Sequence, residues 1–287
     1  MQTFVVRSED GVALRGRDFE GPSPDAPALL LHHGLASSQH IWDLMLPGLA
    51  RRFRVVTYDA RGHGRSGKPP SGYGFEHIVS DALAVMRATR LRRPVIVGHS
   101  WGAMTAMELV ARHPRSASGA VLVDGGFTSL GDSMDWKTAK AQLAPPTLTG
   151  LRVDEFREGI RRRSPVPVTP EIEALFLSLM HVDARGRIRP RLSRANHFRI
   201  LHAIWEQDPV ALAGMLRVPV IVIAARSADP ESRSFLELKR LAAARLREAT
   251  RGKDVRLTWM EGVHDLPVQH PGALARRISR FAAEVVE

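Results

Sequence analysis

The stretch Gly-His-Ser-Trp-Gly at residues 98–102 stands between two segments of opposite character. The apolar run at 94–97 (PVIV) predicts a buried strand, and residues 103–110 (AMTAMELV) favour a helix. A G-x-S-x-G pattern between a strand and a helix is typical of a sharp turn that exposes the serine hydroxyl. The two glycines follow from this turn, which leaves no room for a Cβ at their positions. We therefore expect Ser100 to be a nucleophile at a helix N-terminus, where backbone N–H groups favour negative charge.

Three further segments join an apolar run to a polar turn. Residues 28–32 lead into His33-Gly34, residues 53–58 lead into DARGHGRSG at 59–67, and residues 255–260 lead into EGVHD at 261–265. Strands that alternate with helices predict a doubly wound, mostly parallel sheet with its active site at the carboxyl ends of the strands. In this order the motifs resemble the α/β-hydrolase superfamily. The resemblance implies an α/β fold with an eight-stranded sheet and a helical cap.

The chain is expected to form one core with one insertion. Residues 1–124 and 211–287 would make up the core, and residues 125–210 would form the cap. Roughly 90 residues between two strands are too many for a plain crossover, so we expect most of them to cover the catalytic face. Residues 156–163, 171–180 and 196–206 look helical, and the arginine-rich stretch at 184–194 looks like a loop. Candidate pocket-lining residues are Trp136, Phe156, Leu175, Phe176 and Met180.

The resemblance also implies roles for single residues. A serine hydroxyl needs a base to accept its proton, and a histidine suits this role because its pKa lies near 6.5. His264 follows the last predicted strand in a Gly-x-His turn, where the family places the base. By the same resemblance, the backbone N–H groups of Leu35 and Trp101 would form the oxyanion hole. We expect His63 and His99 to make structural hydrogen bonds.

The acid that orients His264 has two candidates. The commoner family position lies a few residues after the seventh strand, where the sequence has alanine and Asp229 comes one residue late. The less common position lies at the end of the sixth strand, where VLVDGG at 121–126 places Asp124. This spacing from the nucleophile resembles that of the haloalkane dehalogenases. The sequence favours Asp124 and keeps Asp229 as the alternative.

These residues point to a serine hydrolase that cleaves carboxylic esters of small molecules through an acyl-enzyme. Epoxide hydrolases and haloalkane dehalogenases need an aspartate at the position of Ser100. Lactonase, C–C-bond hydrolase, aminopeptidase and perhydrolase activities use the same serine machinery and stay open as alternatives. A ligand-binding protein that keeps the fold but turns over slowly or not at all is the alternative outside the enzymes.

The composition bears on the partners, metal sites and location that we expect for the protein. The 287 residues carry a formal charge of +11, yet the 36 arginines are scattered without an aromatic-interleaved basic stripe, so no nucleic-acid partner is expected. The absence of cysteine excludes disulfides, thiolate metal sites and a cysteine nucleophile. Without 18 consecutive apolar residues, no membrane span is expected. We expect no cofactor and no metal, a cytoplasmic location, and, from only five lysines and one asparagine, a thermostable protein.

Overall fold

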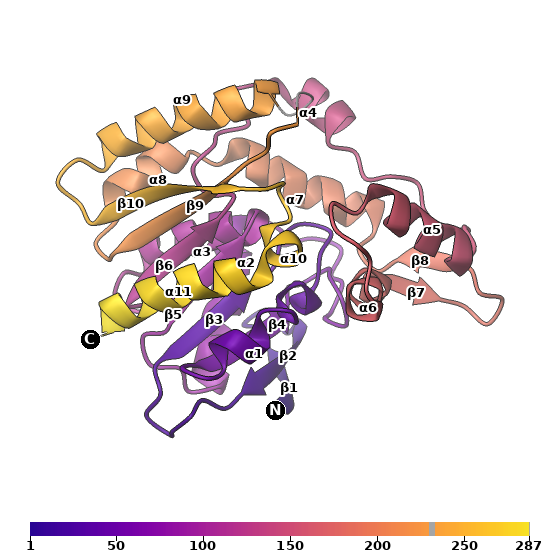
Figure 1. The fold of residues 1–287 in the computed structure, drawn as a ribbon, viewed down its shortest axis with the longest axis horizontal. Coiled ribbons are helices and arrows are strands. Elements are labelled where there is room, and N and C mark those ends of the chain that lie inside the picture. Colours follow the sequence, from indigo (N-terminus) through magenta and orange to yellow (C-terminus); the bar gives the residue numbers. More distant parts are fainter. Residues whose placement is uncertain (230–232, 287) are drawn as a thin grey trace.

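The computed structural model describes residues 1–229 and 233–286 (Figure 1). The predicted core range 211–287 includes residues 230–232 and 287, which lie outside the described part. In the described part, no helix is both long and apolar enough to cross a membrane.

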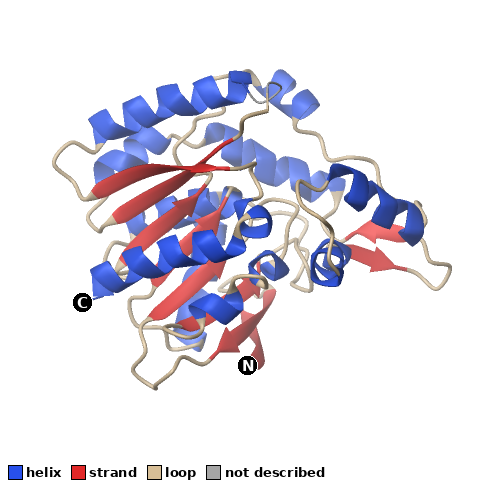
Figure 2. Cartoon of the chain, viewed as in Figure 1, coloured by secondary structure: helices blue, strands red, loops and turns tan. Residues whose placement is uncertain are grey.

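An eight-stranded sheet, whose strands are red in Figure 2, forms the centre of the structure. Its strand order is β1-β2-β4-β3-β5-β6-β9-β10. Strand β2 pairs antiparallel with both of its neighbours, β1 and β4, and all other neighbouring strands of this sheet pair parallel. The predicted fold class is thereby confirmed. The strands are β1 (Gln2–Arg7), β2 (Ala13–Phe19), β3 (Ala28–His32), β4 (Arg54–Asp59), β5 (Val95–His99), β6 (Gly119–Val123), β9 (Val220–Arg226) and β10 (Val255–Glu261).

Helices cover both faces of the sheet, because neighbouring side chains of a strand point to opposite faces. Leu29 and Leu31 pack in the same cluster as residues of α1 and α11, whereas Leu30 packs with residues of α2 and α3 on the other face. Continuous apolar strands such as β3 are therefore buried on both faces of the sheet, as is usual for parallel strands. Figure 1 shows α11 on the near face and α2 and α3 on the far face. The helices of the two layers are α1 (Leu46–Leu49), α11 (Pro271–Val286), α2 (Phe75–Ala88), α3 (Trp101–Arg112), α8 (Pro209–Met215) and α9 (Arg233–Ala249); the short η1 (Gln39–Trp42) and α10 (Leu266–Gln269) lie in loops.

The segment between β6 and α8 carries helices and a small hairpin, and its α5, α6, β7 and β8 extend beyond one end of the sheet (Figure 1). The hairpin replaces part of a predicted helix and part of a predicted loop, so the predictions for 171–180 and 184–194 are wrong in those parts. Its turn explains why: Asp183 Oδ1 accepts from the backbone N–H groups of Arg185 and Arg187, both at 2.9 Å, and Gly186 takes a positive φ of 71°. The elements are α4 (Trp136–Gln142), α5 (Val153–Arg163), α6 (Pro170–Ser178), β7 (Met180–Val182), β8 (Ile188–Pro190) and α7 (Arg194–Glu206).

Candidate active site

Ser100 stands on the strained turn between β5 and α3. Its backbone is left-handed, with φ 57° and ψ −119°, a conformation that costs energy for a residue with a side chain. A Cβ on Gly98 would lie 2.0 Å from the carbonyl oxygen of Gly102, and a Cβ on Gly102 would lie 2.1 Å from that of His32. Both positions are therefore restricted to glycine, as the sequence predicts. The turn holds the Ser100 hydroxyl at the carboxyl end of β5.

The side chains of Ser100, His264 and Asp124 form a chain of hydrogen bonds. His264 Nε2 lies 2.9 Å from Ser100 Oγ, and His264 Nδ1 lies 2.6 Å from Asp124 Oδ2. The three residues follow β5, β10 and β6, whose carboxyl ends meet at one edge of the sheet. In this arrangement Nδ1–H donates to the carboxylate, which leaves Nε2 free to accept the serine proton.

The side-chain carboxylate of Asp124 is fully buried and accepts four hydrogen bonds from three donor groups. Oδ1 accepts from the backbone N–H of Ala225 at 2.8 Å, in addition to the bond from His264 to Oδ2. Lys239 Nζ contacts both oxygens, at 2.6 and 2.8 Å. Asp229, the other candidate acid, lies on the exposed turn after β9, where its backbone N–H donates to Ser227 Oγ at 3.1 Å. In the structure, the hydrogen-bond partner of His264 Nδ1 is therefore Asp124 and not Asp229.

Opposing effects set the charge of the His264–Asp124 pair. Desolvation lowers the pKa of His264, but the hydrogen bond and the charge of Asp124 outweigh it, so that the pKa rises above its ordinary value. Burial raises the pKa of Asp124, but the hydrogen bonds and charges of His264 and Lys239 bring it below the ordinary value. Asp124 is therefore ionised at neutral pH and favours the imidazolium form of its partner.

The turn after β3 lies directly against Ser100. A Cβ on Gly34 would lie 3.1 Å from the Cβ of Ser100, closer than an ordinary van der Waals contact, so glycine favours this close approach. His33 braces the turn, because its Nδ1–H donates to the carbonyl of Gly34 at 2.8 Å while its Nε2 accepts from Ala60 N at 3.0 Å. This places the backbone of Leu35, the residue that follows Gly34, at the rim of the site.

His63 and His99 both make structural hydrogen bonds, as the sequence suggests. His63 Nε2 accepts from the backbone N–H of Ala36 at 3.2 Å, next to Leu35. His99 Nε2 donates to the carbonyl of His264 at 2.9 Å, and burial lowers its pKa to about 4. A neutral His99 thus holds the loop that carries the candidate base. Trp101 is 1% exposed and stacks on His63 at 5.2 Å between ring centroids, so its indole is part of the core.

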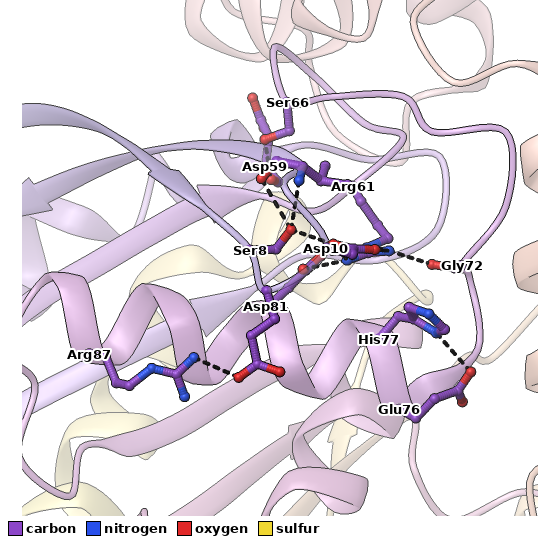
Figure 3. Close-up of polar contacts among 12 residues, drawn as sticks. Ser8, Asp10, Asp59, Arg61, Ser66, Gly72, Glu76, His77, Asp81 and Arg87 are labelled. Carbon is purple, nitrogen blue, oxygen red and sulfur yellow. Dashed lines mark hydrogen bonds and ion pairs between the residues drawn. The ribbon is translucent and has the colours of Figure 1, made fainter.

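A buried guanidinium anchors the loop at 59–67 that carries His63 (Figure 3). Arg61 donates twice to Asp81, both bonds at 2.7 Å, and twice to Asp10, at 2.8 and 2.9 Å. Its last hydrogen goes to the carbonyl of Gly72 at 2.8 Å. All five N–H donors of Arg61 are thus used, which fixes the loop against α2.

A cavity of about 600 Å³ lies between the core and the 125–210 segment. It reaches residues beside the triad, namely Ala36, His63 and Asp265. Three of the five candidate lining residues border it, and they are Phe156, Phe176 and Met180. The other two do not: Leu175 packs in the core cluster that contains residues of α1 and α11, and Trp136 packs against Trp205, with ring centroids 6.0 Å apart. The rest of the lining is mixed: apolar residues such as Pro145, Leu148 and Leu192 stand beside the charged residues Glu155, Glu158, Arg162, Arg163 and Arg191.

Sequence reasoning missed one residue that touches the candidate triad. Lys239 lies in α9, more than a hundred residues from Asp124, and no motif surrounds it. Among the residues that the structure describes, no group of three or more His, Asp or Glu could hold a metal ion.

Comparison with known proteins agrees with this architecture. A family model described as the alpha/beta hydrolase fold matches residues 27–152. A bifunctional esterase/perhydrolase of Acinetobacter calcoaceticus is 40% identical over 120 residues, which cover 41% of this chain and 43% of that protein. A non-heme haloperoxidase of Rhodococcus erythropolis is 38% identical over 156 residues, which cover 54% and 53%. The chain spans about half the length of these curated relatives, or less.

Among solved structures, the crystal structure of an E-2-(acetamidomethylene)succinate hydrolase is similar along nearly the whole chain. The TM-score is 0.75 at 22% sequence identity, and the alignment covers 98% of this chain and 99% of that one. At this identity the similarity concerns the fold, and the substrate of that enzyme does not transfer to this chain.

Proposed function

Because the chain belongs to the α/β-hydrolase superfamily, we propose that it is a serine hydrolase that cleaves carboxylic esters through an acyl-enzyme on Ser100. The hydrogen-bonded chain from Ser100 Oγ through His264 to Asp124, at 2.9 and 2.6 Å, is the observation that carries the proposal. A nucleophile, a base and an orienting acid at these distances are what acyl transfer requires.

In the proposed reaction, Ser100 Oγ attacks the ester carbonyl while His264 Nε2 takes the hydroxyl proton. The backbone N–H groups of Leu35 and Trp101 would stabilise the oxyanion, since Trp101 follows the serine in the chain and Leu35 follows Gly34, which lies against the serine. His264 then gives its proton to the departing alcohol, and Asp124 compensates the charge of the imidazolium in between. In the second half, His264 activates a water molecule that releases the acid from Ser100.

The apolar part of the cavity suggests the substrate class. Its volume of about 600 Å³ falls within the range of small-molecule sites. Aromatic and aliphatic side chains from the 125–210 segment, among them Phe156 and Phe176, line it. We propose that this segment acts as a lid and that the cavity takes an apolar acyl or aryl group.

A panel of p-nitrophenyl esters of increasing acyl length tests the proposal. Wild type should hydrolyse them, and Ser100→Ala should fold but lose at least about three orders of magnitude in kcat/KM. Phe176→Ala should change the preferred acyl length, whereas Trp136→Ala, which alters the same segment away from the cavity, should leave that preference as it is. Hydrolysis by Ser100→Ala at the wild-type rate would refute the serine mechanism.

Perhydrolysis is the second candidate, because the Acinetobacter relative is named an esterase/perhydrolase. Hydrogen peroxide would then replace water in the second half of the reaction. Acetic acid and peroxide should yield peracetic acid in the presence of wild type and not of Ser100→Ala. No peracid above the uncatalysed background would remove this candidate and leave the esterase proposal untouched.

A further inference from the structure

A buried lysine lies on the carboxylate of the candidate triad. Lys239 is 6% exposed, and its Nζ contacts Oδ1 and Oδ2 of Asp124 at 2.6 and 2.8 Å. The third hydrogen of the ammonium goes to the carbonyl of Ala225 at 3.1 Å, at the end of β9. All three donors of the lysine are thus directed at the edge of the sheet where the triad lies.

Packing alone does not call for a lysine at this position. Removing an ammonium from water is costly unless a charged partner offsets it, and an apolar side chain of similar volume would fill the space in α9 without that cost. The partner here is the carboxylate that already binds His264 through Oδ2. One carboxylate therefore serves two potential cations, the ammonium of Lys239 and the imidazolium of His264.

The ammonium also restricts the conformation of the acid. It bridges both oxygens, while the backbone N–H of Ala225 holds Oδ1 at 2.8 Å. Rotation of the carboxylate away from His264 would break these bonds at a position buried from solvent, since the Asp124 side chain is 0% exposed.

Building on the proposed function, we propose that Lys239 is a positioning residue of the active site. Its ammonium fixes the Asp124 carboxylate toward His264 and takes a share of the negative charge that would otherwise stabilise the imidazolium. The base is then deprotonated at a lower pH than a His–Asp pair without the lysine would allow.

Four titratable groups face His264 from the elements around it. The pKa of His264 is raised by Asp124, which follows β6, and by Asp265, the next residue in the chain after His264. It is lowered by the desolvation of the ring and by Lys239 from α9. His99 from β5 lies 4.9 Å away between ring centroids and is neutral in the working range, because burial lowers its pKa to about 4. Lys239 contributes a positive charge that lowers the pKa of His264, so removing this charge favours the imidazolium.

The pH dependence of kcat/KM for p-nitrophenyl acetate tests this assignment in the full chain. Lys239→Met removes charge and donors, and Lys239→Gln keeps a donor but removes the charge. Both variants should move the acidic limb upward by about 0.5–1 pH unit. When each rate is divided by the plateau of the same protein, the value at pH 6 should then be roughly three- to tenfold lower in the variants than in wild type. Lys253→Met is the matched control, since Lys253 Nζ bonds the carbonyl of Leu216 at 3.1 Å, outside the triad. It should leave the limb unchanged within about 0.2 unit.

An acidic limb at the wild-type position in both Lys239 variants would overturn the proposal. A loss of rate that is equal at every pH would also overturn it, because packing alone would then explain the lysine. If neither variant folds, the double variant Asp124→Asn/Lys239→Met removes both charges and should fold again. A double variant that stays unfolded contradicts the pairing.

If the protein is not a serine hydrolase, the role of Lys239 can still be tested separately. In that case wild type shows no turnover that depends on Ser100, and the lysine is tested by NMR titration of the His264 ring in wild type and Lys239→Gln. The ring should titrate at a higher pH in the variant whether or not the protein is an esterase. Equal titration midpoints would contradict the role of Lys239 directly.

Discussion

Asp124 and His264 stand 140 residues apart in the chain, yet Asp124 Oδ2 lies 2.6 Å from His264 Nδ1. They meet because β6 and β10 both belong to the parallel part of the sheet and end at the same edge, with only β9 between them. Asp124 itself has a left-handed backbone, with φ 46°, at the point where the chain leaves β6. The strained turn directs its side chain across the end of β9, and Ala225 N–H holds it there.

The first prediction concerns the choice of acid. Asp124→Asn should reduce kcat by about 10⁴, because the amide lets His264 adopt the wrong tautomer and leaves its transient charge uncompensated. Asp229→Asn is the control from the alternative position and should change kcat less than about tenfold. The reverse ranking would move the acid to the turn after β9, and both rates should be measured on the same ester.

The second prediction concerns pH. The base acts only when neutral, and Asp124 raises the pKa of His264 above 6.5, so kcat/KM should fall as the pH falls below a midpoint that lies above 6.5. Removing the negative charge reverses this shift. The residual activity of Asp124→Asn should therefore have its acidic limb at a lower pH than wild type. A limb at higher pH in this variant would contradict the assigned electrostatics.

The third prediction concerns the buried guanidinium of the loop at 59–67. Asp81 and Arg61 each expose 1% of the side chain, so Asp81→Asn leaves an arginine charge without its buried partner. We expect a loss of about 3–5 kcal/mol in the free energy of unfolding in denaturant titrations. Glu76→Gln removes a charge from the same helix at an exposed pair with His77 and should cost less than about 0.5 kcal/mol. Equal small losses would show that Arg61 is not anchored by Asp81.

The fourth prediction concerns thermal stability. A chain with 36 arginines, one asparagine and no cysteine avoids the residues that heat damages most readily. We expect a calorimetric midpoint above about 65 °C, the upper end of the range for mesophilic domains. A midpoint below about 60 °C would contradict this prediction, and the arginine excess would then reflect genome composition alone.

The sequence predicts the sheet and the elbow well, because both leave local signals. Apolar runs of the length of one strand mark β3, β5 and β6, and the glycines at 98 and 102 follow from a turn that has no space for a Cβ. The position of Asp124 was also open to sequence reasoning, since it depends on a strand end and a spacing. Choosing it over Asp229 required the geometry of the His264 ring.

Other features depend on contacts that leave no local pattern. Lys239 reaches Asp124 only because α9 packs beside β9, and a single lysine in an amphipathic helix looks like any surface residue. The hairpin of β7 and β8 is encoded by the turn chemistry of Asp183 and Gly186, which the arginine-rich composition around it obscured. Trp136 and Leu175 were expected at the cavity, but hydrophobicity does not distinguish lining from packing.

Covalent labelling of Ser100 tests the central claim most directly. A fluorophosphonate reacts with a serine only when a neighbouring base activates it, and it needs no knowledge of the natural substrate. We predict rapid stoichiometric labelling of wild type, an adduct that peptide mass spectrometry maps to Ser100, and no labelling of Ser100→Ala. Wild-type protein that stays unlabelled, or an adduct on another residue, would contradict the proposal that this chain is a serine hydrolase.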